Sequence, residues 1–325
     1  MKTKKPDIFL GITMGMLVLA AVLCILILKT QKSKNETTTT EPPQIASTDA
    51  TNPFPGGSEA PNNTESVPST EHPTQPPKDL SPINDAQLKS ELDESLRGLT
   101  SEWQVMVIDP AFNTEIGSAV NCRGEDWMTA NRMAQVFIMG TVFQQAADGK
   151  LELDSVLDDV KAMINTDDTY AADRLTETIG SGDASKGREA VKAFAVDNGL
   201  QLGFNRSLSG SGSQKNYVKA EQTAKLLNMI CRGELVSEEA SRQMLEILLT
   251  PVDGLEIETG LLGEDLRYGF VVDVESNVCV CAMGVVQNAN RSFVISVVCN
   301  GPVTIEGAKN KVTELIKLTA PYFAE

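Results

Sequence analysis

The longest uninterrupted apolar run of the chain spans residues 8–28, IFLGITMGMLVLAAVLCILIL, and contains no charged residue. Its 21 residues match the roughly 20 that an α-helix needs to cross about 30 Å of hydrocarbon. A cleaved signal peptide has a shorter apolar core followed by small residues, whereas this run continues directly into Lys29. The pattern therefore predicts an uncleaved transmembrane helix at 8–28, with residues 1–7 as a short cytoplasmic N-terminus.

Residues 29–82 are rich in Thr, Ser, Pro and Asn, and ten of the 15 prolines of the chain lie between residues 35 and 82. A segment with so few large apolar groups cannot offset the entropy of ordering, so we expect a disordered linker. Lysines flank the apolar run equally on both sides, so charge does not orient it. Linkers of this composition are typical of tethers outside the cell membrane, and a cytoplasmic linker is the alternative.

Residues 83–325 show the periodicities of a folded domain. Asn84 followed by Gln87 has the form of a capping box, and leucines at 88, 92 and 96 predict a helix after it. A hairpin is predicted from the runs 103–109 and 115–120. A helix apolar on several sides is expected between 131 and 149, more helices follow, and three strand-like runs and a helix end the chain. This order predicts an α/β (α+β) domain with a five-stranded antiparallel sheet flanked by helices.

The charge of the chain argues against a nucleic-acid partner. The formal net charge is -16, and no basic run interrupts the acidic domain. The single histidine, His72, lies in the linker, so the domain can build neither a histidine-containing catalytic triad nor a histidine-ligated zinc site. Nothing in the sequence indicates a cofactor.

Five cysteines fall in the domain, and an odd number cannot pair completely. Two of them, Cys279 and Cys281, share one face of a predicted strand, which is too extended for a metal-binding or redox motif. We expect small buried apolar side chains at these positions, and one cross-strand disulfide that involves Cys299 is left open. The remaining two are Cys122 and Cys231.

Several segments together resemble the class A β-lactamases and related penicillin-recognising serine hydrolases. The resemblance covers residues 84 to 320 and rests on the order and spacing of five segments and the final strands. These segments are VIDPAFNTEIGSAV, QQAADGKLELD, MINTDDTYAADRLTETIG, VKAFAVDNGL and LLNMICRGELVSE.

The resemblance implies a catalytic serine at the start of the buried helix and a lysine three residues later that accepts its proton. Counting back from Gly149 at the family's usual interval places the serine position at Arg132 and the lysine position at Gln135. A guanidinium is no nucleophile, and a carboxamide is no base. A register shifted by three would pair Thr129 with Arg132, which stays protonated. Both catalytic groups are therefore expected to be missing.

The family's second motif, Ser-Asp-Asn, is matched here by Thr166-Asp167-Asp168. In this match Asp168 replaces a neutral amide with an anion. Because the family brings this motif opposite the helix start, we predict an ion pair between Arg132 and Asp168 across the former active site. A simpler alternative is that both aspartates occupy the first turn of a helix, where anions are favoured.

The third motif, Lys-Thr-Gly at the start of a strand, is best matched by Arg267-Tyr268-Gly269. Arg267 would then keep a cation in the cleft, and the alternative is a charge at a strand edge. The fourth motif is a glutamate in the loop after an arginine, but no acid follows Arg206 until Glu221, and the serine- and glycine-rich loop between them reads as flexible.

These losses favour a membrane-anchored, extracytoplasmic pseudoenzyme with a binding or structural role in the cell envelope. A cell-wall peptide or another envelope protein would be its partner. Backbone N–H groups at the helix start, together with Arg267, are expected to be what remains for binding a peptide carboxylate. The rival interpretation is a working hydrolase of β-lactams or D-Ala-D-Ala peptides with a displaced nucleophile.

Overall fold

The computed structural model describes residues 80–211, 213–250, 267–275, 279–301 and 303–323. The predicted N-terminus, the membrane helix at 8–28 and nearly all of the linker lie outside these residues. Among the helices that the structure describes, none combines the length and the apolar character needed to cross a bilayer.

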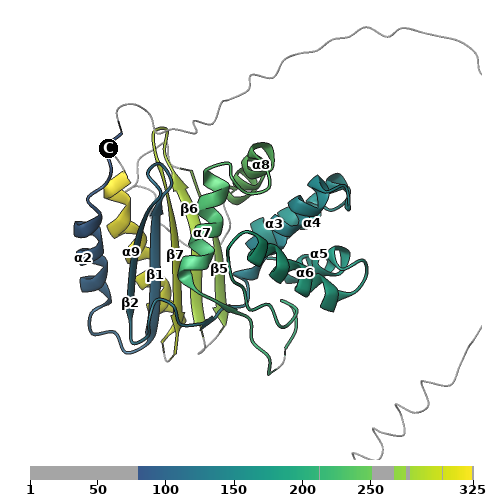
Figure 1. Ribbon diagram of the computed structural model, residues 1–325. Coiled ribbons are helices and arrows are strands. Elements are labelled where there is room, and N and C mark those ends of the chain that lie inside the picture. Colours follow the sequence, from purple (N-terminus) through teal and green to yellow (C-terminus); the bar gives the residue numbers. More distant parts are fainter. Residues whose placement is uncertain (1–79, 212, 251–266, 276–278, 302, 324–325) are drawn as a thin grey trace, which may run out of the picture. The chain divides into compact units, whose positions relative to one another are not determined.

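Five long strands form one antiparallel sheet in the order β2-β1-β7-β6-β5, which confirms the predicted sheet (Figure 1). The first hairpin and the last three strands meet where β1 pairs with β7, with Glu102 opposite Asn300. The strands are β1 (Glu102–Asp109), β2 (Thr114–Val120), β5 (Arg267–Glu275), β6 (Cys279–Gln287) and β7 (Ser292–Asn300).

Helices cover both faces of this sheet, as the apolar strands require. Eight of the nine residues of β6 are buried, and a strand without a polar face needs cover on both sides. The helices are α2 (Asp85–Leu96), α3 (Ala134–Ala147), α4 (Leu157–Asn165), α5 (Thr169–Ile179), α6 (Ala184–Asp197), α7 (Ala220–Cys231), α8 (Glu238–Leu248) and α9 (Ile305–Thr319). Among the described residues there are also two short 3₁₀ helices, η1 (Leu153–Ser155) and η3 (Ala320–Phe323).

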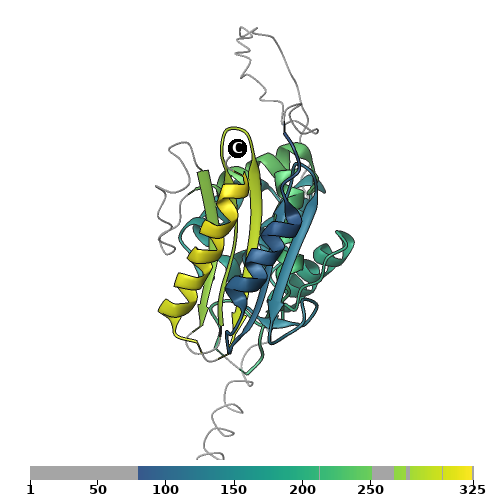
Figure 2. The same cartoon turned by 90° about the vertical axis from the view of Figure 1, so that its left-hand side faces the viewer.

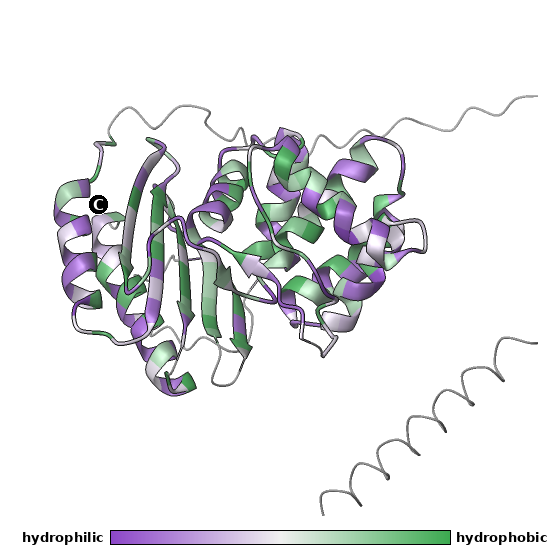
Figure 3. Cartoon of the chain, turned by 60° about the horizontal axis from the view of Figure 1, so that its bottom comes forward, coloured by the Kyte–Doolittle hydropathy of each residue, from purple (hydrophilic) through white to green (hydrophobic). Residues whose placement is uncertain are grey.

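The helices divide into two layers. Helices α2 and α9 contact each other and lie side by side on one face of the sheet, as Figure 2 shows. Helix α7 packs against β1 and β7 on the opposite face, and α3 to α6 and α8 lie on that side (Figure 1). The strands between the layers are largely apolar in Figure 3, in agreement with a separate buried cluster on each face.

Local sequence explains how the first and the central helix form. The Asn84 side chain accepts a hydrogen bond from the Gln87 backbone N–H at 3.1 Å, which is the predicted cap of α2. Helix α3 has ten consecutive buried residues, from Ala134 to Phe143. The prediction of a central helix buried on several sides is therefore confirmed.

A two-stranded ribbon, which the sequence analysis did not predict, leads into α3. Strand β3 (Met128–Thr129) pairs with β4 (Tyr217–Val218), and four residues, 130–133, separate β3 from α3. Both strands have only two residues, too few for a period-two pattern to be recognised. The ribbon fixes the direction in which the chain enters α3.

All five cysteines of the domain are unpaired thiols. Cys281 lies opposite Val298, and Cys299 lies opposite Val280, so the two cysteines point to different faces of the sheet. A disulfide between them is excluded by this register. Burial raises the pKa of the Cys231 and Cys299 thiols to about 12, which suits the expected role of small apolar side chains.

Candidate functional site at the start of helix α3

Helix α3 begins at a tight turn and lacks a side-chain cap of its own. Asn131, Arg132 and Met133 form the turn, and the Arg132 carbonyl accepts the Gln135 N–H at 2.9 Å. The N-cap position is Met133, whose side chain makes no cap hydrogen bond. The first backbone N–H groups of the helix therefore need acceptors from elsewhere in the fold.

The carboxylate of Asp273, on strand β5, accepts hydrogen bonds from the turn that precedes the helix. One of its oxygens accepts the backbone N–H of Asn131, and the same oxygen accepts the N–H of Arg132 at 3.0 Å. Asp273 is 2% exposed. A buried anion is favourable at this point because the N-terminus of a helix carries partial positive charge.

A second carboxylate, that of Asp167, binds the side chains of Arg132 and Gln135. The Arg132 guanidinium forms an ion pair with one Asp167 oxygen, and the Gln135 Nε2 donates to the other at 3.0 Å. Asp167 lies between α4 and α5 with φ of 54°, in the left-handed region that turns its side chain out of either helix. The two residues that the sequence analysis assigned to the serine and lysine positions thus bind one carboxylate.

The Asp167 carboxyl is partly withdrawn from water. Burial raises its pKa above the usual value, and the Arg132 guanidinium and the Gln135 amide offset part of this rise. The side chains of Arg132 and Asp167 are each 31% exposed, so solvent weakens their attraction. The pair is best described as half-buried.

We expect the Asp167→Asn variant to gain stability relative to the wild type as the pH rises from about 3.5 to 7. The folded-state pKa of Asp167 is raised, so the folded wild type holds this proton more tightly than the unfolded chain does. Wild-type stability therefore falls as the pH rises from the ordinary carboxyl pKa through the raised value. The asparagine variant has no such proton.

Urea unfolding at several pH values measures this difference. Asp183→Asn is the matched control, because hydrogen bonds from the Lys186 and Ser185 backbone N–H groups lower the pKa of Asp183. Its stability relative to the wild type should move in the opposite direction over the acidic range. Parallel trends in the two variants would contradict the pKa direction given for Asp167.

In the second motif, the residue that pairs with Arg132 is Asp167, one position before the predicted Asp168. Asp168 does not pair with Arg132, because its carboxylate accepts the N–H groups of Tyr170 and Ala171, at 2.9 and 3.1 Å, as the N-cap of α5. The Thr166 hydroxyl donates back to the Ala162 carbonyl at 2.8 Å. The predicted Arg132–Asp168 ion pair is therefore wrong, and the helix-start alternative is right for Asp168.

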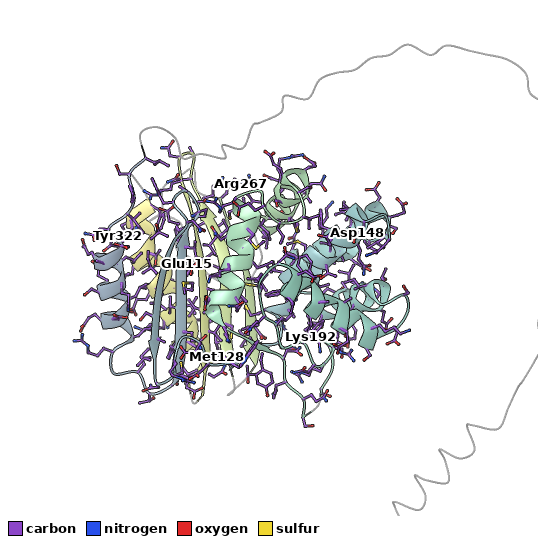
Figure 4. All side chains as sticks on the ribbon, viewed as in Figure 1. Glu115, Met128, Asp148, Lys192, Arg267 and Tyr322 are labelled. Carbon is purple, nitrogen blue, oxygen red and sulfur yellow. The ribbon has the colours of Figure 1, made fainter. Side chains whose placement is uncertain are left out.

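The third motif does not lie at this site. Arg267 is six residues from Asp273 along β5, which corresponds to about 20 Å in an extended strand. Its guanidinium makes two hydrogen bonds with Glu246, at 3.1 and 2.7 Å, and Figure 4 shows it at the opposite end of the sheet from Met128 of β3. Gly269, two residues further on, packs against the Leu248 carbonyl of α8. The alternative of a strand-edge charge is right for Arg267.

The loop after Arg206 is tied to the start of α3. The Asn131 Nδ2 donates to the Leu208 carbonyl at 3.0 Å, and its Oδ1 accepts from Asn216 at 2.7 Å. Asp173 of α5 accepts the Leu208 N–H at 2.8 Å. The expectation of a simply flexible loop is therefore wrong for these residues, although they carry no carboxylate of their own.

Asp273 and Asp167 are the residues that the sequence analysis missed or misassigned. The sequence signal for Asp273 was a single acidic residue within the apolar run GFVVDV. A carboxylate in a buried strand is stable only where hydrogen-bond donors contact it. The site combines the Arg132–Asp167 ion pair, the Gln135 carboxamide and two backbone N–H groups that are already bound by the Asp273 carboxylate. Within the described residues, no cluster of three or more His, Cys, Asp or Glu side chains could hold a metal ion.

The shifted register does not place Thr129 on helix α3. Thr129 belongs to strand β3, and its backbone N–H and carbonyl are both bound by the Asn300 side chain, at 2.7 and 2.9 Å. It precedes the helix and cannot share a helical face with Arg132. The Thr129–Arg132 pair of the shifted register therefore does not lie on one face of helix α3.

A family model described as "Beta-lactamase enzyme family" matches residues 155–320. The match begins at the end of η1, after α3, and includes the last three strands and α9. A comparison with curated proteins found no match.

Solved structures of β-lactamases share the fold at low sequence identity. The β-lactamase from Sphaerobacter thermophilus aligns with a TM-score of 0.61 and 14% identity, over 73% of this chain and 96% of that one. The TLA-1 extended-spectrum β-lactamase aligns with a TM-score of 0.64 and 14% identity, over 74% and 99%. A variant of the last common ancestor of the class A β-lactamase of Gram-negative bacteria aligns with a TM-score of 0.61 and 18% identity, over 72% and 97%.

Proposed function

The chain belongs to the β-lactamase enzyme family, and we propose that it is a member without serine acyl-transfer catalysis, a pseudoenzyme of the cell envelope. One observation supports the proposal: Arg132 and Gln135, which we assign to the serine and lysine positions at the start of α3, both bind Asp167 with their side chains. The group that should attack a carbonyl is instead a cation in an ion pair.

Each chemical step of the family's reaction lacks its group at this site. Acylation needs a nucleophile and a base, and neither a guanidinium nor a carboxamide provides one near neutral pH. Hydrolysis of an acyl intermediate needs a base in the loop after Arg206, and residues 207–216 contain no acid. The Asp173 carboxylate that reaches this loop already accepts two of its backbone N–H groups.

The binding role that we propose uses the outer surface of the domain rather than the former cleft. The two features expected to hold a peptide carboxylate are both engaged: Arg267 by Glu246, and the Arg132 N–H by Asp273. A cell-wall peptide therefore gains little support as a ligand at this site. Another envelope protein is the partner that we propose, and no nucleic acid is expected from a chain of net charge -16.

We further propose that residues 8–28 anchor the protein in the cell membrane and that residues 29–82 hold the domain away from it on the extracytoplasmic side. The uncharged 21-residue run and the proline-rich composition of the linker support this proposal.

Hydrolysis of a chromogenic cephalosporin by the purified full-length chain tests the loss of turnover. We expect a rate equal to that of buffer, and the same rate for the double variant Arg132→Ala/Gln135→Ala, which removes both side chains from the site. Turnover in the wild type that disappears in the double variant would instead favour the rival, a hydrolase with a displaced nucleophile.

A further inference from the structure

Strand β2 is an edge strand, and within the described residues no other strand pairs with its outer side. It ends the sheet order β2-β1-β7-β6-β5 and pairs with β1 in an unbroken register, so it contains no bulge (Figure 1). Natural sheets protect such edges with prolines, lysines, bulges or inward-pointing charges. The sequence of β2, TEIGSAV, has neither proline nor lysine, and its one charged residue, Glu115, is exposed.

The opposite edge of the sheet has a protection that β2 lacks. Strand β5 contains the buried carboxylate of Asp273, and an inward-pointing charge disfavours pairing with a further strand. Of the two edges, β2 is therefore the one whose sequence leaves it able to accept a strand.

A cavity of about 730 Å³ follows the outer side of β2, and we call it the β2 groove. Four consecutive residues of the strand, Gly117–Val120, line this groove, which corresponds to about 13 Å of strand. Three of the four have small side chains, so the floor of the groove lies close to the backbone. Helix α2 lines one side, and residues 124–125 with the start of α7 line the other. An extended chain fits such a space.

The two sides of the β2 groove differ in charge. On the α2 side, Lys89 and Arg97 outnumber Asp93, whereas on the other side Glu125 and Glu221 are both anionic. Successive side chains of a strand point to opposite faces, so a chain paired with β2 would place alternate residues over each side. Acidic or polar residues suit the α2 side, and basic residues suit the other. These charges have surface partners within the chain, so we expect them to select a partner more than to supply affinity.

Two occupants from the chain itself suit the β2 groove less well. A second copy paired β2 to β2 about a two-fold axis would place the two cationic sides together and the two anionic sides together. The linker at 29–82 has ten prolines between residues 35 and 82, and proline has no backbone N–H for a strand ladder.

We propose that the β2 groove is the docking surface for another envelope protein, which adds an extended segment to the sheet beside β2. The side chains of this segment alternate between acidic or polar residues, which lie over α2, and basic residues, which lie over Glu125 and Glu221. The inference rests on the proposed binding role of the domain and deepens it, because it names the surface and the chemistry of the partner.

Binding of a designed peptide to the full-length protein tests the proposal. The probe is acetyl-EKTVEKT-amide, which places glutamate and threonine on one face of a strand and lysine and valine on the other. Fluorescence anisotropy of the labelled probe should show saturable binding below about 1 mM. Hydrogen–deuterium exchange should slow for the outward-pointing amides of residues 114–120 and stay unchanged in β5.

Two control peptides separate strand pairing from charge. The probe N-methylated at two adjacent central residues loses backbone donors on both of its edges and should not bind. The peptide acetyl-ETKVETK-amide has the same composition but places all its charges on one face, so it should bind about fivefold more weakly than the probe.

A pair of protein variants tests the position of the probe. Arg97→Glu changes the α2 side of the groove and should weaken binding about threefold. Arg242→Glu on α8 is the matched control, because both arginines are exposed and pair with a glutamate three residues earlier. This second variant should bind the probe as the wild type does.

The proposal is overturned if the probe shows no saturable binding, if the N-methylated probe binds equally well, or if β5 is protected instead of β2. Slow exchange of the outward-pointing β2 amides without the probe would also overturn it. Protection that grows with protein concentration would then identify a second copy as the occupant, and protection independent of concentration would identify the chain's own linker. Hydrolysis of a β-lactam by the wild type would refute the loss of catalysis without affecting probe binding, so the two failures are distinguishable.

Discussion

Replacing Asp109 by alanine is expected to lower the free energy of unfolding by about 3 to 5 kcal/mol, because the buried partner charge is left without its counter-ion. Asp109 ends β1, and one of its oxygens lies 2.5 Å from an Arg291 side-chain nitrogen in the β6–β7 turn. The two side chains are 0% and 5% exposed. The Arg291 guanidinium also lies near the rings of Phe112 and Phe323, at 5.5 and 5.2 Å, so it cannot move to solvent without losing this packing.

Urea denaturation of the full-length variant and the wild type measures this loss. Glu239→Ala is the control, since Glu239 also forms an ion pair, with Arg242, but on the exposed surface of α8. Exposed pairs contribute little, so this variant should remain close to the wild type. Similar losses in both variants would show that burial does not set the cost of breaking the Asp109–Arg291 pair.

The Gly269→Ala variant should lose about 3 kcal/mol or more, through a steric clash rather than through any role in catalysis. A methyl group at this position would lie 1.4 Å from the Leu248 carbonyl oxygen at the end of α8. Because the contact is with a backbone atom, it cannot be relieved by a change of side-chain rotamer, so either α8 or β5 must shift. The structure thus gives Gly269 a packing role in place of the motif role assigned from sequence.

Gly117→Ala provides a matched test, because Gly117 is also a strand glycine. Its added methyl group would lie 3.1 Å from the flexible end of the Met106 side chain, which can move aside. Thermal unfolding should therefore show a large loss for Gly269→Ala and a small one for Gly117→Ala. Equal losses would mean that strand propensity, not the contact with Leu248, dominates.

The sheet and the central helix could be predicted from sequence because each rests on a long repeated pattern. The run from Ala134 to Phe143 is apolar around most of a helix, and β6 and β7 are apolar on both faces. Such patterns leave only one way to bury these segments, against one another. The capping pattern at Asn84 was also correct, since a cap depends only on residues nearby in the chain.

The site was harder to predict because its contacts depend on single residues. One left-handed residue, Asp167, sets which of three consecutive polar side chains faces Arg132, and no periodicity reveals it. The position of a motif along an apolar strand is equally undetermined, since the side-chain pattern of β5 repeats every two residues. For this reason Arg267 was assigned to the cleft although it pairs with Glu246 at the first position of β5, and Asp273 was overlooked.

Covalent labelling by a fluorescent penicillin tests the loss of acyl transfer most directly, because it detects an acyl intermediate even where turnover is too slow to follow. The full-length protein is incubated with the probe, denatured and separated by electrophoresis, with an active class A β-lactamase variant that accumulates its acyl-enzyme as the positive control. The arrangement of Arg132, Gln135 and Asp167 predicts no fluorescent band for this protein. A band that survives denaturation, with the probe mapped by mass spectrometry to a side chain of residues 80–323, would contradict it.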